Sequence, residues 1–274
     1  MTLCVCIATN EGIVLAADSR QTYFNQAKMP RIGTDYGEKV FELNPRIGVA
    51  CYGWAFLTRK NIASLIEDFK VTLQGNNLKV KQAAMKLAEF FEAKYTEDIE
   101  AKLNTPVATG FIAIGFIVAG YDEKSSVGEM YACQIPGKIV NKTTDTNSPG
   151  CAWNGQGEIV QRLVKGFDGQ LDKLKGFSPD LKAELPKLEL ITNFMAMTVQ
   201  DAIDYATFLV RTRVDAQRFS DGTVLNPGSF PGVGGSIDVA VLRPSSGFHW
   251  VQQKQLVADS RTITAPTRNK PDQN

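Results

Sequence analysis

Two short apolar runs near the N-terminus decide the fold: residues 3–9 are LCVCIAT and residues 12–18 are GIVLAAD. Both runs are rich in residues that favour β-strands, and only two polar residues, Asn10 and Glu11, separate them. Gly12 then supplies a conformationally permissive turn position. This pattern predicts a β-hairpin, so the chain begins inside a sheet.

Further strands follow from the same signals. Asn44-Pro45 and Pro136-Gly137 are typical turn dipeptides, and each joins two apolar runs into a predicted strand pair. Strands are expected at residues 39–43, 47–53, 110–121, 128–135, 138–143, 236–242 and 248–254. The segment between the first two pairs, residues 21–37, is predicted to be a polar loop.

Four helices are predicted from apolar residues that recur every three to four positions. Two lie at roughly 55–74 and 78–103, and a third follows the NGQGE sequence at 154–158. The NGQGE sequence lacks both the GxGxxG spacing and the lysine of a phosphate-binding loop, so we interpret it as a glycine turn before that helix. The fourth helix begins after Thr198, which is a favourable N-cap, with Asp201 in its first turn.

Strands and helices therefore come in separate runs, without strand–helix–strand units. This order indicates an α+β layered protein and excludes a doubly wound nucleotide-binding fold. We expect one domain over residues 1–259, with an irregular insertion at about 168–197. The polar tail at 260–274 contains two prolines and is expected to be disordered.

Composition narrows the classes of function. The chain has 274 residues, of which 43% are hydrophobic, and 30 basic residues balance 29 acidic ones. A net charge of +1 gives no field for nonspecific binding to nucleic acid or to an anionic membrane, so neither is expected as a partner. The longest apolar run, 107–121, is too short for a spanning helix, and the N-terminus lacks a basic region. A cytoplasmic protein is expected.

Cysteine and histidine give no support for a metal or cofactor site. The cysteines are odd in number and sit in apolar settings, so we interpret them as small buried hydrophobic residues: Cys4, Cys6, Cys51, Cys133 and Cys151. His249 is the only histidine, and it lies in an alternating segment typical of a strand. No cofactor and no metal are predicted, and hydrolytic chemistry would need a base other than histidine.

Thr2 offers such a base. Aminopeptidases remove an initiator methionine when the next residue is small, so the mature chain can begin with this threonine. A free α-amino group has a pKa of about 7.7–8.0 and can accept the proton of the hydroxyl in the same residue. A second-position threonine is common, so the hypothesis depends on partner residues: Asp18 ends the predicted hairpin, Lys39 begins the next strand, and Gly53 closes the strand after that.

Residues 2–53 resemble the N-terminal half of proteasome β-type subunits, which belong to the N-terminal-nucleophile hydrolase superfamily. The resemblance rests on the AADSR strand end at 16–20, the KVFELN segment at 39–44 and the small-residue-Gly pair before the first helix. It implies a four-layer αββα sandwich. It further implies that Thr2 is the nucleophile, that Asp18 and Lys39 form the charged pair beside it, and that the Gly53 N–H binds the oxyanion.

Two later segments are similar to the family's motifs only in part. In AWNGQGE, Asn154 occupies the place of a serine near the threonine amine, and in RVDAQRFSDG, Asp215 and Ser220 are the matching supporters of that amine. Two extra residues separate Asp215 from Ser220 relative to the family's motif, and the glycine pair lies downstream at Gly234-Gly235. Arg20 is interpreted as structural.

The resemblance implies a threonine peptidase that hydrolyses peptide bonds through an acyl-enzyme, inside a homo-oligomeric ring that encloses unfolded protein or peptide substrates. Two alternatives stay open: a catalytically silent proteasome-like scaffold subunit, and a small-molecule amidase of the same superfamily. Amidases of this kind commonly use Cys or Ser, which favours the peptidase. The sequence does not identify the substrate, the ring size or any unfoldase partner.

Overall fold

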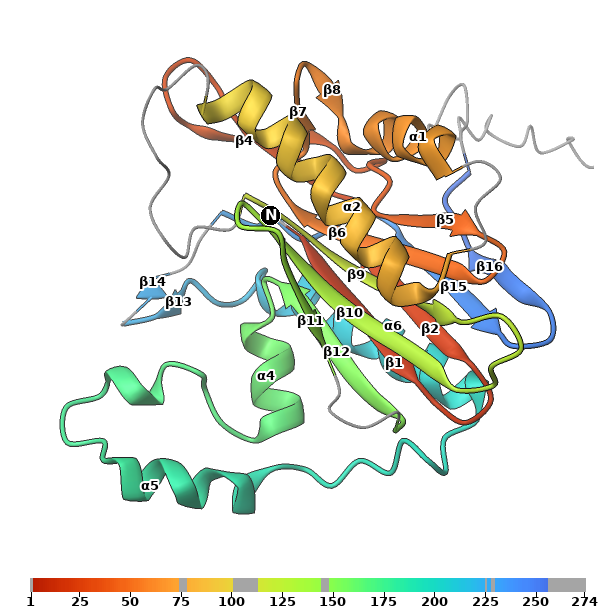
Figure 1. Ribbon diagram of the computed structural model, residues 1–274. Coiled ribbons are helices and arrows are strands. Elements are labelled where there is room, and N and C mark those ends of the chain that lie inside the picture. Colours follow the sequence, from red (N-terminus) through yellow and green to blue (C-terminus); the bar gives the residue numbers. More distant parts are fainter. Residues whose placement is uncertain are drawn as a thin grey trace, which may run out of the picture.

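The computed structural model describes residues 2–73, 78–100, 113–143, 148–224, 226–227 and 230–255. It is an α+β fold built on two five-stranded antiparallel sheets that face each other (Figure 1). The fold class expected from the order of strands and helices is therefore confirmed.

The first sheet has the strand order β12-β1-β2-β15-β16 and contains the N-terminal hairpin. In that hairpin Cys4 pairs with Ala17 and Ala8 pairs with Ile13, which confirms the predicted pairing. Every residue of β1 and β2 is buried, because both faces of this sheet are covered. The bounds are β1 Leu3–Ala8, β2 Ile13–Asp18, β12 Gly150–Gly155, β15 Ile237–Arg243 and β16 Gly247–Gln252.

The second sheet has the order β11-β10-β9-β6-β5. Its strands lie close to the predicted positions, and β9 is buried along its whole length. The bounds are β5 Val40–Asn44, β6 Ile47–Gly53, β9 Ile114–Tyr121, β10 Gly128–Ile135 and β11 Ile139–Lys142. Residues 110–112 of the predicted strand lie outside the described residues.

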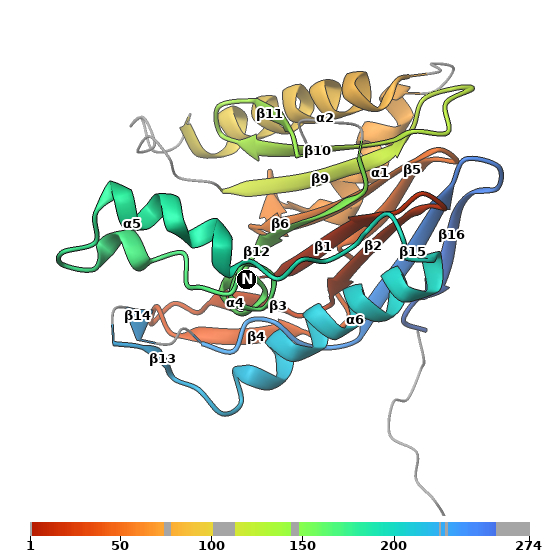
Figure 2. The same cartoon turned by 90° about the horizontal axis from the view of Figure 1, so that it is seen from below.

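Helices cover the outer face of each sheet (Figure 2). On the second sheet lie α1 (Ile62–Leu73) and α2 (Val80–Tyr95), which continues as the π-helix η1 (Thr96–Glu100). On the first sheet lies α6 (Val199–Ala216), with α4 (Glu158–Lys165) beside it. One apolar cluster fills the space between the sheets, and one more fills each helix–sheet interface.

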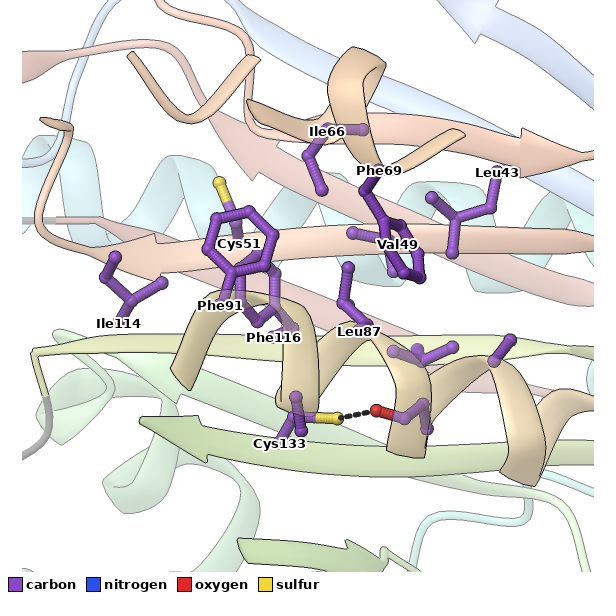
Figure 3. Close-up of a cluster of buried hydrophobic side chains, with 14 of the residues drawn as sticks. Leu43, Val49, Cys51, Ile66, Phe69, Leu87, Phe91, Ile114, Phe116 and Cys133 are labelled. Atoms are coloured by element: carbon purple, nitrogen blue, oxygen red, sulfur yellow. Dashed lines mark hydrogen bonds between the residues drawn. The ribbon is translucent and has the colours of Figure 1, made fainter. Parts of the chain in front are cut away.

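The cluster beneath α1 and α2 shows why these segments form helices there (Figure 3). The residues that carry the predicted helical period all point at the sheet and are buried. In the middle of this layer the rings of Phe91 and Phe116 lie 4.6 Å apart, and the Cys133 thiol donates to the Ala84 carbonyl at 3.6 Å. The period residues are Ile62, Leu65, Ile66, Phe69, Leu73, Val80, Ala84, Leu87, Phe91 and Tyr95.

Three elements differ from the sequence-based expectation. The predicted polar loop at 21–37 contains a hairpin of β3 (Gln21–Phe24) and β4 (Pro30–Thr34), whose residues are all partly or fully exposed. The small hairpin of β7 (Phe56–Leu57) and β8 (Lys60–Asn61) delays the start of α1. Residues 150–155 form β12 and pair with β1. All three are short, so they carry little periodic signal.

The insertion at 168–197 is irregular, as predicted. It contains the 3₁₀ turns η2 (Leu171–Lys173) and η3 (Leu185–Leu188) and the short helix α5 (Pro179–Glu184), which has no buried residue. It ends where Thr198 caps α6: the Thr198 side chain accepts from the Asp201 N–H, and the Asp201 carboxylate accepts from the Thr198 N–H. The two-residue strands β13 (Gly222–Thr223) and β14 (Asn226–Pro227) follow α6.

The remaining predictions concern location and side-chain setting. Cys4, Cys6, Cys51 and Cys133 are buried and Cys151 is half-buried, while His249 is an exposed residue of β16. Within the described ranges, no helix combines the length and apolarity needed to cross a membrane. The predicted disordered tail at 260–274 lies outside the described residues.

Candidate active site

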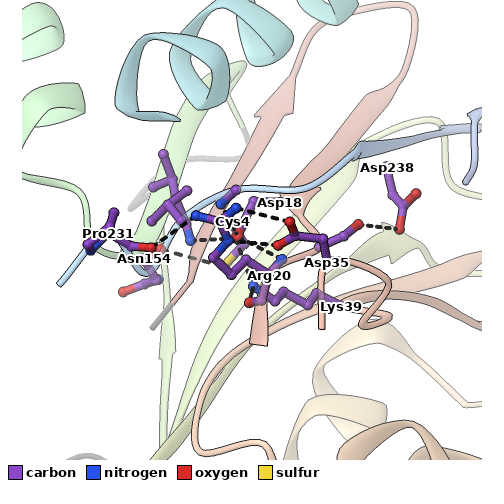
Figure 4. Close-up of polar contacts among 12 residues, drawn as sticks. Cys4, Asp18, Arg20, Asp35, Lys39, Asn154, Pro231 and Asp238 are labelled. Carbon is purple, nitrogen blue, oxygen red and sulfur yellow. Dashed lines mark hydrogen bonds and ion pairs between the residues drawn. The ribbon is translucent and has the colours of Figure 1, made fainter. Parts of the chain in front are cut away.

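Asp18 ends β2 and is fully buried, and its carboxylate accepts four hydrogen bonds (Figure 4). Oδ1 accepts from the Leu3 N–H at 3.0 Å and from Lys39 Nζ at 2.9 Å. Oδ2 accepts from the Arg20 N–H at 3.1 Å and from the Gly234 N–H at 2.9 Å. Because every lone pair of the two oxygens has a donor, this carboxylate suits an electrostatic role and not that of a general base.

Lys39 reaches Asp18 from the opposite sheet. The residue directly precedes β5, and its carbonyl accepts from the Cys51 N–H of β6 at 2.8 Å. Its side chain is 4% exposed, and Nζ also donates to the Arg20 carbonyl at 2.6 Å. The ammonium therefore has a carboxylate and a carbonyl as fixed partners, which hold it at one place in a buried setting.

Thr2 lies next to this pair and is 5% exposed. Its carbonyl accepts from the Gln156 N–H at 2.7 Å. Gly155 has a φ of +94°, and a Cβ there would stand 1.9 Å from the Thr2 carbonyl oxygen, so this turn tolerates only glycine. The glycine turn predicted at NGQGE is thus the element that holds the start of β1.

One pocket brings together Thr2, Lys39 and Gly53, three of the four residues to which the sequence resemblance gives central roles. The fourth, Asp18, binds Lys39 and is not among the described residues that line the pocket. Gly53 ends β6 with a φ of +99°, and a Cβ there would lie 2.2 Å from the Ala113 carbonyl oxygen. The walls come from β3, from the segment before β5 and from the segment after β6. The lining residues are Thr2, Arg20, Gln21, Thr22, Glu38, Lys39, Cys51, Tyr52, Gly53, Trp54, Ala55 and Ile62.

The other predicted supporters lie elsewhere. Asn154 is in β12 opposite Cys4, and its carbonyl accepts from the Cys4 thiol at 3.7 Å. Asp215 is in the last turn of α6, and Ser220 is exposed beyond it, where its hydroxyl accepts from the Gly222 N–H. In the described part of the chain, none of these three lines the Thr2 pocket. Their proposed roles stay predictions.

Two main-chain contacts were not foreseen, and the contacts of one side chain were not specified. The Gln156 and Gly234 N–H groups bind Thr2 and Asp18, and a sequence gives no direct signal for main-chain donors. Arg20, interpreted as structural, binds both oxygens of Asp35 at 2.7 and 3.0 Å and also the Pro231 carbonyl. It thereby ties the base of the β3–β4 hairpin to the Gly234 loop. The arginine directly after the AADS strand end was the available signal.

The cysteines nearest the pair are chemically quiet. Burial raises the pKa of the Cys51 thiol to about 12, although the Lys39 ammonium acts in the opposite direction. Burial raises the pKa of the Cys4 thiol as well. Both thiols stay protonated at neutral pH, and a thiol is a poor nucleophile without its thiolate. Among the described residues, no group of His, Cys, Asp and Glu is arranged to hold a metal ion.

No protein-family model matches the chain, and the comparison with curated proteins gives no match.

Proposed function

We propose that this chain is an N-terminal threonine peptidase that resembles proteasome β subunits. The observation that carries the proposal is the shared pocket of Thr2, Lys39 and Gly53, together with the buried Asp18–Lys39 pair at its base. The helix-covered sheets support the same proposal, since they fit the αββα sandwich that the sequence resemblance implies.

The mechanism begins once Met1 is removed. The free α-amine of Thr2 accepts the proton of its hydroxyl, and the Lys39 ammonium favours the alkoxide that forms. Asp18 neither donates nor accepts a proton: it holds the ammonium in place. The threonine oxygen attacks the carbonyl carbon of a peptide bond, and the Gly53 N–H stabilises the oxyanion. The Thr2 α-ammonium then returns its proton to the nitrogen of the scissile bond, so the C–N bond breaks, the product amine leaves and the acyl-enzyme ester remains.

Water then completes the cycle. The α-amine accepts a proton from a water molecule, which attacks the ester carbonyl, and the Thr2 oxygen leaves and recovers its proton. All chemistry comes from groups of the chain itself. The five free cysteines fit a reducing compartment, so we propose the cytoplasm as its location and unfolded protein or peptide as its substrate.

The test combines mass and activity. Intact mass spectrometry should show loss of Met1, and a fluorogenic peptide should be hydrolysed by wild type and not by Thr2→Ala. Serine at this position keeps the oxygen and the amine, so Thr2→Ser should retain part of the rate. If protein that lacks Met1 hydrolyses no peptide, the chain is a silent scaffold. If it hydrolyses small acyl amides only, it is an amidase.

A further inference from the structure

A second buried Lys–Asp pair lies beside the first, and the mechanism above does not use it. Lys254 Nζ binds Asp238 Oδ2, and the Lys254 N–H donates to Asp238 Oδ1 at 3.0 Å. The two side chains are 4% and 3% exposed, against 4% and 0% for Lys39 and Asp18. Among the ion pairs of the described residues, only these two are sealed from solvent on both sides. Removing two charges from water costs free energy that their mutual attraction often does not offset, so a buried ion pair suggests a role beyond stability.

Asp238 is the second residue of β15, which pairs with the end of β2, and Lys254 follows β16. Ile237 stands opposite Asp18 in the sheet, and Asp238 stands opposite Ala17. The fully buried Ser19 hydroxyl lies 3.5 Å from Asp238 Oδ2, at the long limit of a hydrogen bond. Figure 4 shows Asp238 on the side of the network away from Asn154. The Asp238 carboxylate thus contacts Ser19, the residue that follows Asp18, and Lys254, which follows β16.

The same stretch of chain carries one of the four donors to Asp18. Gly234 donates to Asp18, and its carbonyl accepts from the Ser19 N–H at 2.9 Å. Residues 237 and 238 follow Gly235 and Ser236, and they are held by the end of β16 and the residues just after it. The Gln252 side chain donates to the Ile237 carbonyl at 2.8 Å, and Lys254 holds Asp238. Removing Lys254 would free the start of β15 and, with it, the Gly234 donor.

We propose that Lys254 is a positioning residue: through Asp238 it holds the Gly234 loop and Ser19, and so fixes the Asp18 carboxylate that orients Lys39. Lys254 thereby acts on the site from a distance, since residues 253–255, the described part of the segment after β16, do not line the pocket. The expected effect on catalysis rests on the proposed threonine peptidase, whereas the expected effect on the hydrogen bonds to Asp18 does not.

The experiment uses the full chain and three variants. Lys254→Met removes the ammonium, Lys254→Met/Asp238→Asn removes both charges so that no unpaired charge is buried, and Lys254→Arg keeps the charge. Lys60→Met is the matched control, because Lys60 pairs with Asp68 at 2.7 Å with side chains 52% and 42% exposed. Amide hydrogen exchange is measured at Leu3, Arg20 and Gly234, whose N–H groups donate to Asp18, and at the β9 amides.

Lys254→Met and the double variant should speed exchange at the three Asp18 donors by roughly tenfold while β9 is unchanged. For a fluorogenic peptide, kcat should fall by a similar factor at constant KM, because the pocket walls are intact. In Lys254→Arg, which keeps the charge, the exchange rates at the three donors and kcat should both stay near the wild-type values. Lys60→Met should change neither quantity.

Unchanged exchange at the three donors in a folded variant would overturn the proposal, as would an equal increase in β9 or a loss of kcat that Lys254→Arg does not restore. If Lys254→Met does not fold, the double variant decides. If wild type itself hydrolyses nothing, the proposed peptidase fails, and the exchange measurement still decides the positioning role.

Discussion

The segment at 2–53 and the insertion at 168–197 use their polar and apolar residues in opposite ways. In the first, a lysine and an aspartate are buried, and each has fixed partners at hydrogen-bond distance. In the second, α5 has no buried residue, and Leu188 and Ile191 are 59% and 100% exposed. Buried charges with fixed partners are typical of a functional site, whereas exposed apolar side chains are typical of an interaction surface.

The largest effect is expected at Lys39. Lys39→Met leaves Asp18 charged, buried and short of one donor, so the free energy of unfolding should fall by about 3–5 kcal/mol. The control variant Lys60→Met breaks an exposed pair, so it should lower the free energy of unfolding by less than about 1 kcal/mol. Urea unfolding measures both. Equal losses would mean that the buried pair has no special energetic weight.

Lys39→Arg separates charge from shape. Arginine keeps the positive charge but replaces the compact ammonium with a planar fork, so turnover of a fluorogenic peptide should be abolished while the fold is retained. Circular dichroism checks folding, and the peptide assay checks turnover. Wild-type rates in this variant would show that Lys39 is an ordinary residue at the head of a strand.

Glycine substitutions sharpen the comparison at the level of the backbone. Gly53→Ala combines a positive φ with a Cβ 2.2 Å from the Ala113 carbonyl oxygen, so it should cost more than about 3 kcal/mol. Gly176→Ala in the insertion has a φ of +86° with no atom within 4 Å, and only the backbone strain of about 1–2 kcal/mol remains. Thermal unfolding measures the loss of stability in each variant, and a larger loss in Gly176→Ala than in Gly53→Ala would contradict the account.

The exposed residues of the insertion predict self-association. We expect a multi-subunit homo-oligomer in which the insertion and the outer surface of α1 and α2 contact other copies. Ile191→Ser together with Leu188→Ser should reduce the oligomer size in sedimentation without lowering the stability of the subunit. A wild type that sediments as a monomer at micromolar concentration would remove this prediction, and an unchanged oligomer would leave the insertion a neutral addition.

The smallest effect concerns pH and the Arg20–Asp35 pair. The hydrogen bond from Arg20 lowers the pKa of Asp35. A carboxylate with a depressed folded-state pKa contributes stability above its unfolded pKa of about 3.9, and this contribution disappears as pH falls through the folded value. The Asp35 side chain is 40% exposed, so solvent screening limits the contribution to about 0–1 kcal/mol. Urea unfolding of Asp35→Asn should lose this part of the acid sensitivity; wild-type sensitivity would contradict it.

The parts of the fold that could be predicted from the sequence are those with a long periodic pattern of apolar residues. The buried strands and the helices α1, α2 and α6 have long periodic signals, so their positions followed from residues such as Leu65, Phe69 and Leu87. The β3–β4 hairpin is short and lacks buried residues, and β12 is short and pairs with the distant β1, so neither leaves a periodic signal in the sequence. The Asp18–Lys39 pair was predicted. The donors from Gln156 to Thr2 and from Gly234 to Asp18 are main-chain N–H groups, which any residue except proline possesses.

The most direct test of the central claim is covalent capture at Thr2. An α′,β′-epoxyketone reacts with a hydroxyl and an α-amine in the same residue and closes a ring, which a serine or cysteine elsewhere in the chain does not allow. Protein that lacks Met1 should be labelled at Thr2 with one adduct per chain, Thr2→Ser should react more slowly, and Thr2→Ala should not react. Peptide mapping by mass spectrometry locates the adduct. Labelling at a cysteine, or none in protein shown to lack Met1, would contradict the account.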